Sequence, residues 1–174
     1  MPDLTFNTGS GKTINREMLL ACLNTATTGS PTWKPVGRRV SDSSEEIAWN
    51  ENTETDILGE TRTELKRPVI TQSFDPMPLD AGDDPSVLIW NKGVKDQDYA
   101  ALANMDMLIV HLYAGTADTA VFAERYSACA VRPTGLGGEG GGNVSMPFDV
   151  TYGGARTVGT AAMSTSGIIF TAST

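Results

Sequence analysis

The stretch that most resembles a nucleotide site is GSGKT, residues 9–13. In a P-loop, backbone N–H groups of a glycine-rich turn hold phosphates and the lysine contacts the outer ones. That motif requires a glycine at position 6, where this chain has Phe6. Too little chain precedes residue 9 to form the strand that leads into such a loop. We therefore interpret residues 1–16 as a flexible polar arm.

A second stretch, GLGGEG at residues 135–140, formally satisfies the spacing G-x-G-x-x-G. A dinucleotide-binding fingerprint must open a helix, because the helix N-terminus holds the pyrophosphate. The segment that follows here, NVSMPFDV, has the pattern of a strand and contains a proline. We interpret residues 135–142 as a glycine-rich connecting loop.

The remaining candidates for catalysis or metal binding are His111 and four aspartates. His111 is the only histidine, lies in an apolar run and has no acid spaced along the sequence to orient it. Asp75, Asp80, Asp83 and Asp84 lack the D-x-D-x-D-G spacing of a calcium loop, so turn and capping roles explain them. The sequence therefore argues against an enzyme, and we expect neither a cofactor nor a metal.

The tryptophans and cysteines favour structural roles. Trp33, Trp49 and Trp90 are more typical of core or subunit-contact anchors than of stacking platforms. Cys22 and Cys129 each lie inside an apolar run, which indicates buried free thiols in a reducing compartment.

Length and charge bound the function. A chain of 174 residues with 40% hydrophobic and 20% charged residues fits one globular domain. Thirteen Lys and Arg against 21 Asp and Glu give a net charge of −8, which disfavours specific binding to nucleic acid. We find neither a signal-peptide pattern nor an apolar run of about 18 residues, and expect a soluble protein made in a cytoplasm.

The dominant element is a predicted β-hairpin over residues 45–74, turning at Leu58-Gly59-Glu60. Its arms alternate, and we place Thr61, Thr63, Leu65, Val69 and Thr71 on one face of the second arm. Each arm runs to about 14 residues against a usual 5–6, so the tip overhangs the core of its own subunit. We expect contacts with a neighbouring subunit from Trp33, Trp49, Thr53, Thr55, Ile57, Leu58, Gly59, Thr61 and Thr63.

The other elements complete a mainly β fold of the sandwich or barrel kind, with one short helix. Residues 17–25 suit either a short helix or a buried strand. Residues 85–92 read as a helix with Asp84 at the N-cap and Pro85 at the first helical position, ended by Gly93. Strands are predicted at residues 33–40, 105–114, 122–131, 143–152, 155–161 and 167–171.

The order of these elements resembles the major tail tube protein of tailed bacteriophages. The resemblance rests on PTWKPVG leading into EIAWNENTETDILGETRTELKRPVITQSFDP, followed by a Pro/Asp loop and a short helix. It favours a strand for residues 17–25. It implies β-sandwich subunits in hexameric rings, stacked into a hollow tube that carries DNA from capsid to host.

The resemblance also implies the partners. These are copies of the chain itself, other tail proteins at the tube ends and DNA passing the lumen without specific binding, in a virion tail assembled in the host cytoplasm. An acidic hairpin face would suit the lumen, since lysine or arginine there would hold phosphates; its candidates are Glu46, Glu54, Asp56, Glu60 and Glu64. The alternative is a monomeric β-sandwich binding module, such as a carbohydrate-binding domain, which needs a platform of exposed aromatic side chains.

Overall fold

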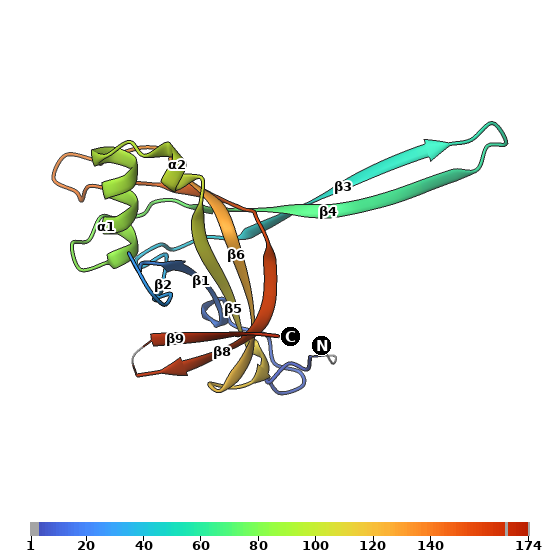
Figure 1. Ribbon diagram of the computed structural model, residues 1–174, viewed down its shortest axis with the longest axis horizontal. Coiled ribbons are helices and arrows are strands. Elements are labelled where there is room, and N and C mark those ends of the chain that lie inside the picture. The colour runs from blue at the N-terminus through green and yellow to red at the C-terminus, as the bar shows by residue number, and fades with distance from the viewer. Residues whose placement is uncertain (1–3, 166, 174) are drawn as a thin grey trace.

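The computed structural model (Figure 1) describes residues 4–165 and 167–173. The described chain is mainly β-structure, with a closed barrel of six strands, a few extra strands and one short helix. The predicted fold class is confirmed. The strands are β1 (Leu19–Asn24), β2 (Trp33–Pro35), β3 (Glu45–Thr55), β4 (Thr61–Phe74), β5 (Met105–Thr116), β6 (Ala120–Pro133), β7 (Phe148–Tyr152), β8 (Arg156–Ser164) and β9 (Gly167–Ala172).

The barrel runs in the order β1-β5-β6-β8-β9-β2 and closes where β2 pairs with β1. Strand β6 is long enough to serve a second sheet as well, in the order β3-β4-β7-β6. All of these pairings are antiparallel. Sharing β6 therefore fixes the hairpin β3–β4 to the barrel through β7.

Two groups of buried side chains hold these sheets together. The barrel interior contains Cys22, Trp33, Leu108, Val110, Val121, Ala123, Ala161 and Ile168. The larger group lies between the barrel wall, β4, β7 and the helix, and includes Leu23, Phe74, Ile89, Met107, Ile109, Phe148 and Tyr152. Because β5 contributes to both groups from its two faces, its sequence is a continuous apolar run instead of an alternating one.

The region of residues 17–25 contains strand β1, as the resemblance favoured, preceded by a single 3-10 turn, η1 (Arg16–Met18). Cys22 at its centre is fully buried and free, as is Cys129, so the prediction that both are buried free thiols is confirmed. The predicted strand over 33–40 shortens to β2, and that over 143–152 shortens to β7. In the latter region Ser145 forms isolated bridges with Pro78 and Gly137.

Helix α1 (Asp84–Trp90) begins one residue earlier than predicted. Asp83, not Asp84, is the N-cap, and its side chain accepts hydrogen bonds from the backbone N–H and hydroxyl of Ser86. The chain then continues through a π-helical turn, η2 (Asn91–Lys95), so Gly93 does not end the helix. A single turn, α2 (Tyr99–Leu102), leads into β5. None of the helices in the described residues is long and apolar enough to span a membrane.

The described part of the N-terminal arm lies against the end of β5. Phe6 bridges Ala114, and its ring packs edge-on against Tyr113 with 5.4 Å between centroids. Residues 1–3 of the predicted arm lie outside the described residues. Phe6, which replaces the glycine of a P-loop, thus has a packing role.

Candidate assembly surface

The hairpin β3–β4 is attached to the body only at its root. Residues Ile70 to Phe74 of β4 pair with β7, from Ile70 opposite Tyr152 to Phe74 opposite Phe148. Beyond Ile70 the two strands continue as an isolated ribbon that extends away from the barrel, on the side opposite α1 (Figure 1). Within the described chain, β3 pairs only with β4, so one full strand edge is open.

A β-bulge divides the hairpin into root and arm. Ala48 is opposite Val69, but Asn50 is opposite Lys66, so β4 has one extra residue at Arg67-Pro68. Proline cannot donate to the ladder and is typical of such a site. The bulge moves Val69 and Thr71 to the face opposite Thr61, Thr63 and Leu65. Our expectation that all five share one face is therefore wrong.

The tip is a turn ordered by one carboxylate. Oδ1 of Asp56 accepts hydrogen bonds from the backbone N–H groups of Leu58 at 2.9 Å and Glu60 at 3.0 Å. Gly59 adopts a φ of 81°, which favours glycine at this position. The two side chains held at the end of the turn are apolar and almost wholly in solvent, Ile57 at 102% and Leu58 at 82% exposure.

The face of the hairpin that includes Ile47 and Trp49 combines hydroxyl pairs with exposed apolar groups. The hydroxyls of Thr53 and Thr63 lie 3.1 Å apart, and those of Thr55 and Thr61 lie 3.2 Å apart. Nearer the root, Ile47, Trp49 and Leu65 are each more than half exposed. A two-stranded ribbon is marginally stable alone, and grouped apolar exposure marks interaction surfaces. This face is therefore the main candidate for contact with another chain.

The opposite face of the arm is charged. Glu54 is opposite Arg62, Asn52 is opposite Glu64, and Glu46 lies at the root opposite Thr71. Of the five acids that we assigned to one face, Glu46, Glu54 and Glu64 lie here. Asp56 and Glu60 belong to the turn, and the carboxylate of Asp56 is used within it.

Below the root, a partly buried polar network joins β5, β6 and β8. His111 Nε2 lies 3.0 Å from Glu124 Oε1, and its Nδ1 lies 2.8 Å from the Tyr113 hydroxyl. Arg156 Nε donates to Glu124 Oε2 at 2.6 Å, and the Tyr126 hydroxyl donates to it at 3.0 Å. His111 is thus a satisfied histidine. The acid that orients it comes from the neighbouring strand, which the spacing along the sequence did not reveal.

This network shifts the pKa of Glu124. Burial alone raises the pKa of the carboxyl, but the hydrogen bonds from His111, Arg156 and Tyr126 outweigh it and lower the pKa to about 2. Glu45, the first residue of β3, lies at the edge of the same network. Its Oε1 is buried without a hydrogen-bond partner, and burial raises its pKa.

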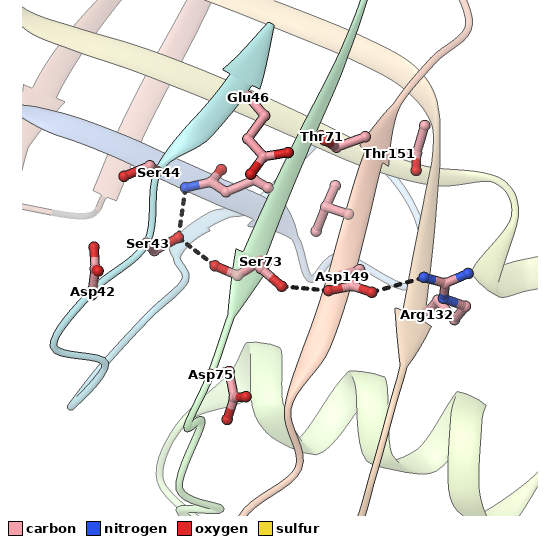
Figure 2. A pocket seen from close by; sticks show the side chains of 12 residues that line it. Asp42, Ser43, Ser44, Glu46, Thr71, Ser73, Asp75, Arg132, Asp149 and Thr151 are labelled. Atoms are coloured by element: carbon pink, nitrogen blue, oxygen red, sulfur yellow. Dashed lines mark hydrogen bonds and ion pairs between the residues drawn. The ribbon is translucent and has the colours of Figure 1, made fainter. Parts of the chain in front are cut away.

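Two hollows flank the root, one on each face of the hairpin. Figure 2 shows the polar one, of about 550 Å³, where Arg132 pairs with Asp149 at 2.8 Å and Asp149 accepts a hydrogen bond from Ser73. The second, of about 580 Å³, lies under the Trp49 face, between the hairpin and the strands β6, β7 and β8. Both lie where the ribbon leaves the body.

The other predicted residues lie elsewhere. Trp33 is 4% exposed inside the barrel, with the Arg125 guanidinium 5.6 Å from its ring centroid, so we remove it from the contact surface. Asp80 holds a turn through the N–H of Gly82. No three His, Cys, Asp or Glu side chains of the described residues are grouped as a metal ion would require.

No family model matches the chain, and no curated protein matches it. Among solved structures, it is similar to the anti-feeding prophage cap, described as a tube-terminating cap. The TM-score is 0.48 at 15% identity, covering 89% of this chain and 96% of that one. It is also similar to the sheath/tube terminator of the extracellular contractile injection system PVC in the extended state, with a TM-score of 0.46 at 11% identity, covering 86% and 99%.

A third similar structure is the PVC sheath-tube complex in the extended state. Its TM-score is 0.42 at 13% identity, covering 94% of this chain and 95% of that one. The second and third of these structures are parts of an extracellular contractile injection system.

Proposed function

We propose that this chain is a structural subunit that assembles with its own copies into rings, stacked as the hollow tube of a phage tail or a tail-like particle. The observation that carries the proposal is the ribbon beyond the bulge. Within the described chain its strands pair only with each other there, yet it presents an open strand edge and several exposed apolar side chains. The number six for the ring follows from the resemblance described above.

The open edge of β3 supports association between strands. Unpaired N–H and C=O groups along 11 residues form a template that another chain can pair with. Monomeric proteins commonly shorten or cover such edges, whereas this edge is long and projects into solvent. The contact surface that we propose comprises Trp49, Thr53, Thr55, Ile57, Leu58, Gly59, Thr61 and Thr63.

Charge supports passage of DNA through the tube without binding. The hairpin 45–74 carries seven acids and three bases, a net charge of −4 that is half of the −8 of the whole chain. Each lysine or arginine that faced a lumen would hold a phosphate and release a counterion. The face that carries Glu46, Glu54 and Glu64 also carries Arg62 and Lys66, so its acids outnumber its bases. We propose that this face lines the lumen. The remaining partners are tail proteins at the tube ends, and the particle assembles in a bacterial cytoplasm.

Electron microscopy of the purified chain over a range of concentration and salt tests the proposal. We expect hollow tubes of uniform width, with light scattering that rises steeply above a critical concentration. Single rings that never stack would indicate a terminating role in the same kind of particle. A monomer under all conditions, also after coexpression with tail proteins, would refute assembly and favour a binding module.

A further inference from the structure

The hollow under the Trp49 face is built to receive a small apolar group beside a negative charge. Ile47 and Trp49 line it from the hairpin, and Tyr126 and Tyr152 line it from the barrel. Arg67 lies at its rim, exposed, and takes part in none of the ion pairs of the described residues. Glu124 and Arg156 also line it but are paired with each other, so the hollow offers apolar walls and one unpaired positive charge.

The tip has the complementary composition. Ile57 and Leu58 are its exposed apolar pair, and Glu60 beside them likewise belongs to none of those ion pairs. The side chain of Glu60 does not hold the turn, because only its backbone groups bond to Asp56. The turn is thus already ordered in the free chain, which lowers the entropic cost of docking.

A tip cannot reach the hollow of its own chain. Ile57 is eight residue steps along the chain from Trp49, and extended backbone rises about 3.3 Å per residue, which places the tip roughly 26 Å beyond the root. The two complementary surfaces therefore lie at opposite ends of one rigid ribbon. Only a second copy can bring them together.

We propose that the tip of one copy docks into the hollow at the hairpin root of a neighbouring copy. Ile57 and Leu58 pack against Ile47 and Trp49, and Glu60 pairs with Arg67. This deepens the proposed function and rests on it. The contact is heterologous, head to tail, so it joins successive copies into closed rings or stacks. One tip buries less than the roughly 1,200–2,000 Å² of a stable interface, so it acts together with the strand-edge contacts.

A charge exchange tests the ion pair in the full-length protein. We expect Glu60→Arg and Arg67→Glu each to raise the critical concentration of assembly roughly two- to fivefold, the range of an exposed ion pair. The double variant should return it to the wild-type value. Glu54→Arg combined with Arg67→Glu is the matched control and should give no rescue. Single variants without effect, or a double variant no better than the singles, would overturn the proposal.

Cysteine cross-linking tests the position without relying on charge. A Leu58→Cys protein is mixed with an Ile47→Cys protein, assembled and treated with a short bismaleimide. The native Cys22 and Cys129 are buried, and burial raises their pKa values to about 12 and 11, so they react slowly. We expect a cross-linked dimer for this mixture and not when Glu51→Cys replaces the Ile47 variant.

The outcomes separate this inference from the proposed function. Tubes that form from the mixture but cross-link only at position 51 would refute docking at the root and leave tube assembly intact. Cross-linking at position 47 within assembled rings or tubes would support both. A wild-type chain that stays monomeric would remove both, and light scattering reports that result independently.

Discussion

Shortening the hairpin in register should separate folding from assembly. Asn52 is opposite Glu64, so replacing residues 53–63 by Asn-Gly leaves these two residues flanking a two-residue turn. We expect a folded subunit that no longer forms rings or tubes. The reason is that the removed segment contains the tip and the hydroxyl pairs but none of the buried side chains.

The expected effect on stability is small, because the removed segment interacts almost entirely with itself. The change removes two threonine hydroxyl pairs and the Glu54–Arg62 pair, each worth about 0.2–1 kcal/mol. The shortened chain also has nine fewer residues to order, which saves about 1–2 kcal/mol of backbone entropy per residue. It loses the ladder hydrogen bonds and the packing of those residues, and this loss roughly cancels the saving. We expect the free energy of unfolding to change by about 1 kcal/mol or less, or roughly 2–4 °C in Tm.

Circular dichroism melts test whether the shortened subunit folds, and electron microscopy with light scattering tests whether it still forms rings or tubes. The matched control is a full-length variant with Thr55→Ser and Thr61→Ser, which retains the hydroxyls and the arm. A shortened protein that fails to fold would show that the arm stabilises the body. Normal tubes from the shortened protein would show that the assembly surface lies elsewhere.

Three further changes test the charged groups. Glu124→Gln should lower the free energy of unfolding at pH 7 by about 3 kcal/mol. Since the folded pKa of about 2 lies below the ordinary 4.5, this contribution is lost as pH falls from 4.5 towards 2, as urea titrations at several pH values will show. Glu45→Gln should stabilise the fold at neutral pH, because burial raises the Glu45 pKa; the gain should vanish below about pH 4.5 in thermal melts. Glu54→Lys with Glu64→Lys should leave tubes intact but slow DNA ejection, more at low salt than at high salt; unchanged ejection would place this face outside the lumen.

The hairpin was predictable from the sequence because both of its signals are local. Alternation with a period of two and a glycine turn lie within 30 residues, and the observed strands end close to the predicted bounds. The bulge was not predicted, although Pro68 inside a strand pattern is a signal for one. Without the bulge, strict alternation places Val69 and Thr71 on the wrong face, because a one-residue shift exchanges the two faces of a strand.

The closure of the barrel and the hydrogen-bond network around Glu124 could not be predicted from local sequence patterns, because both depend on pairing between distant strands. His111 and Glu124 meet because β5 and β6 pair in one particular register, with Ile109 opposite Glu124, and Arg156 joins them from β8. Trp33 is buried for the same reason, since β2 closes the barrel between β1 and β9. A lone tryptophan in a polar stretch gives no sign of that position. The double Asp83-Asp84 likewise offers two possible N-caps, and the structure uses the first, whose carboxylate accepts hydrogen bonds from Ser86.

Hydrogen bonds at the root of the hairpin fix the direction of the ribbon relative to the body, and a repeating assembly needs that fixed direction. The Tyr152 hydroxyl donates to Gln72 Oε1 at 2.5 Å, and Gln72 Nε2 donates to Ser43 Oγ at 3.0 Å. Arg16 donates to the carbonyl of Ser43 at 2.6 Å and 3.0 Å, so the segment before β3 is also tied to the N-terminal side of β1.

These bonds are buried or anchored to the body, whereas every side chain of the arm from Glu46 to Arg67 is exposed. An arm that swung freely would lose orientational entropy at each docking step, at a cost of the same order as the weak contacts that its tip can make. Clamping the root removes most of that cost before a second copy arrives. The hydrogen bonds of Tyr152, Gln72, Ser43 and Arg16 therefore favour assembly, even though none of these side chains belongs to the proposed contact surface.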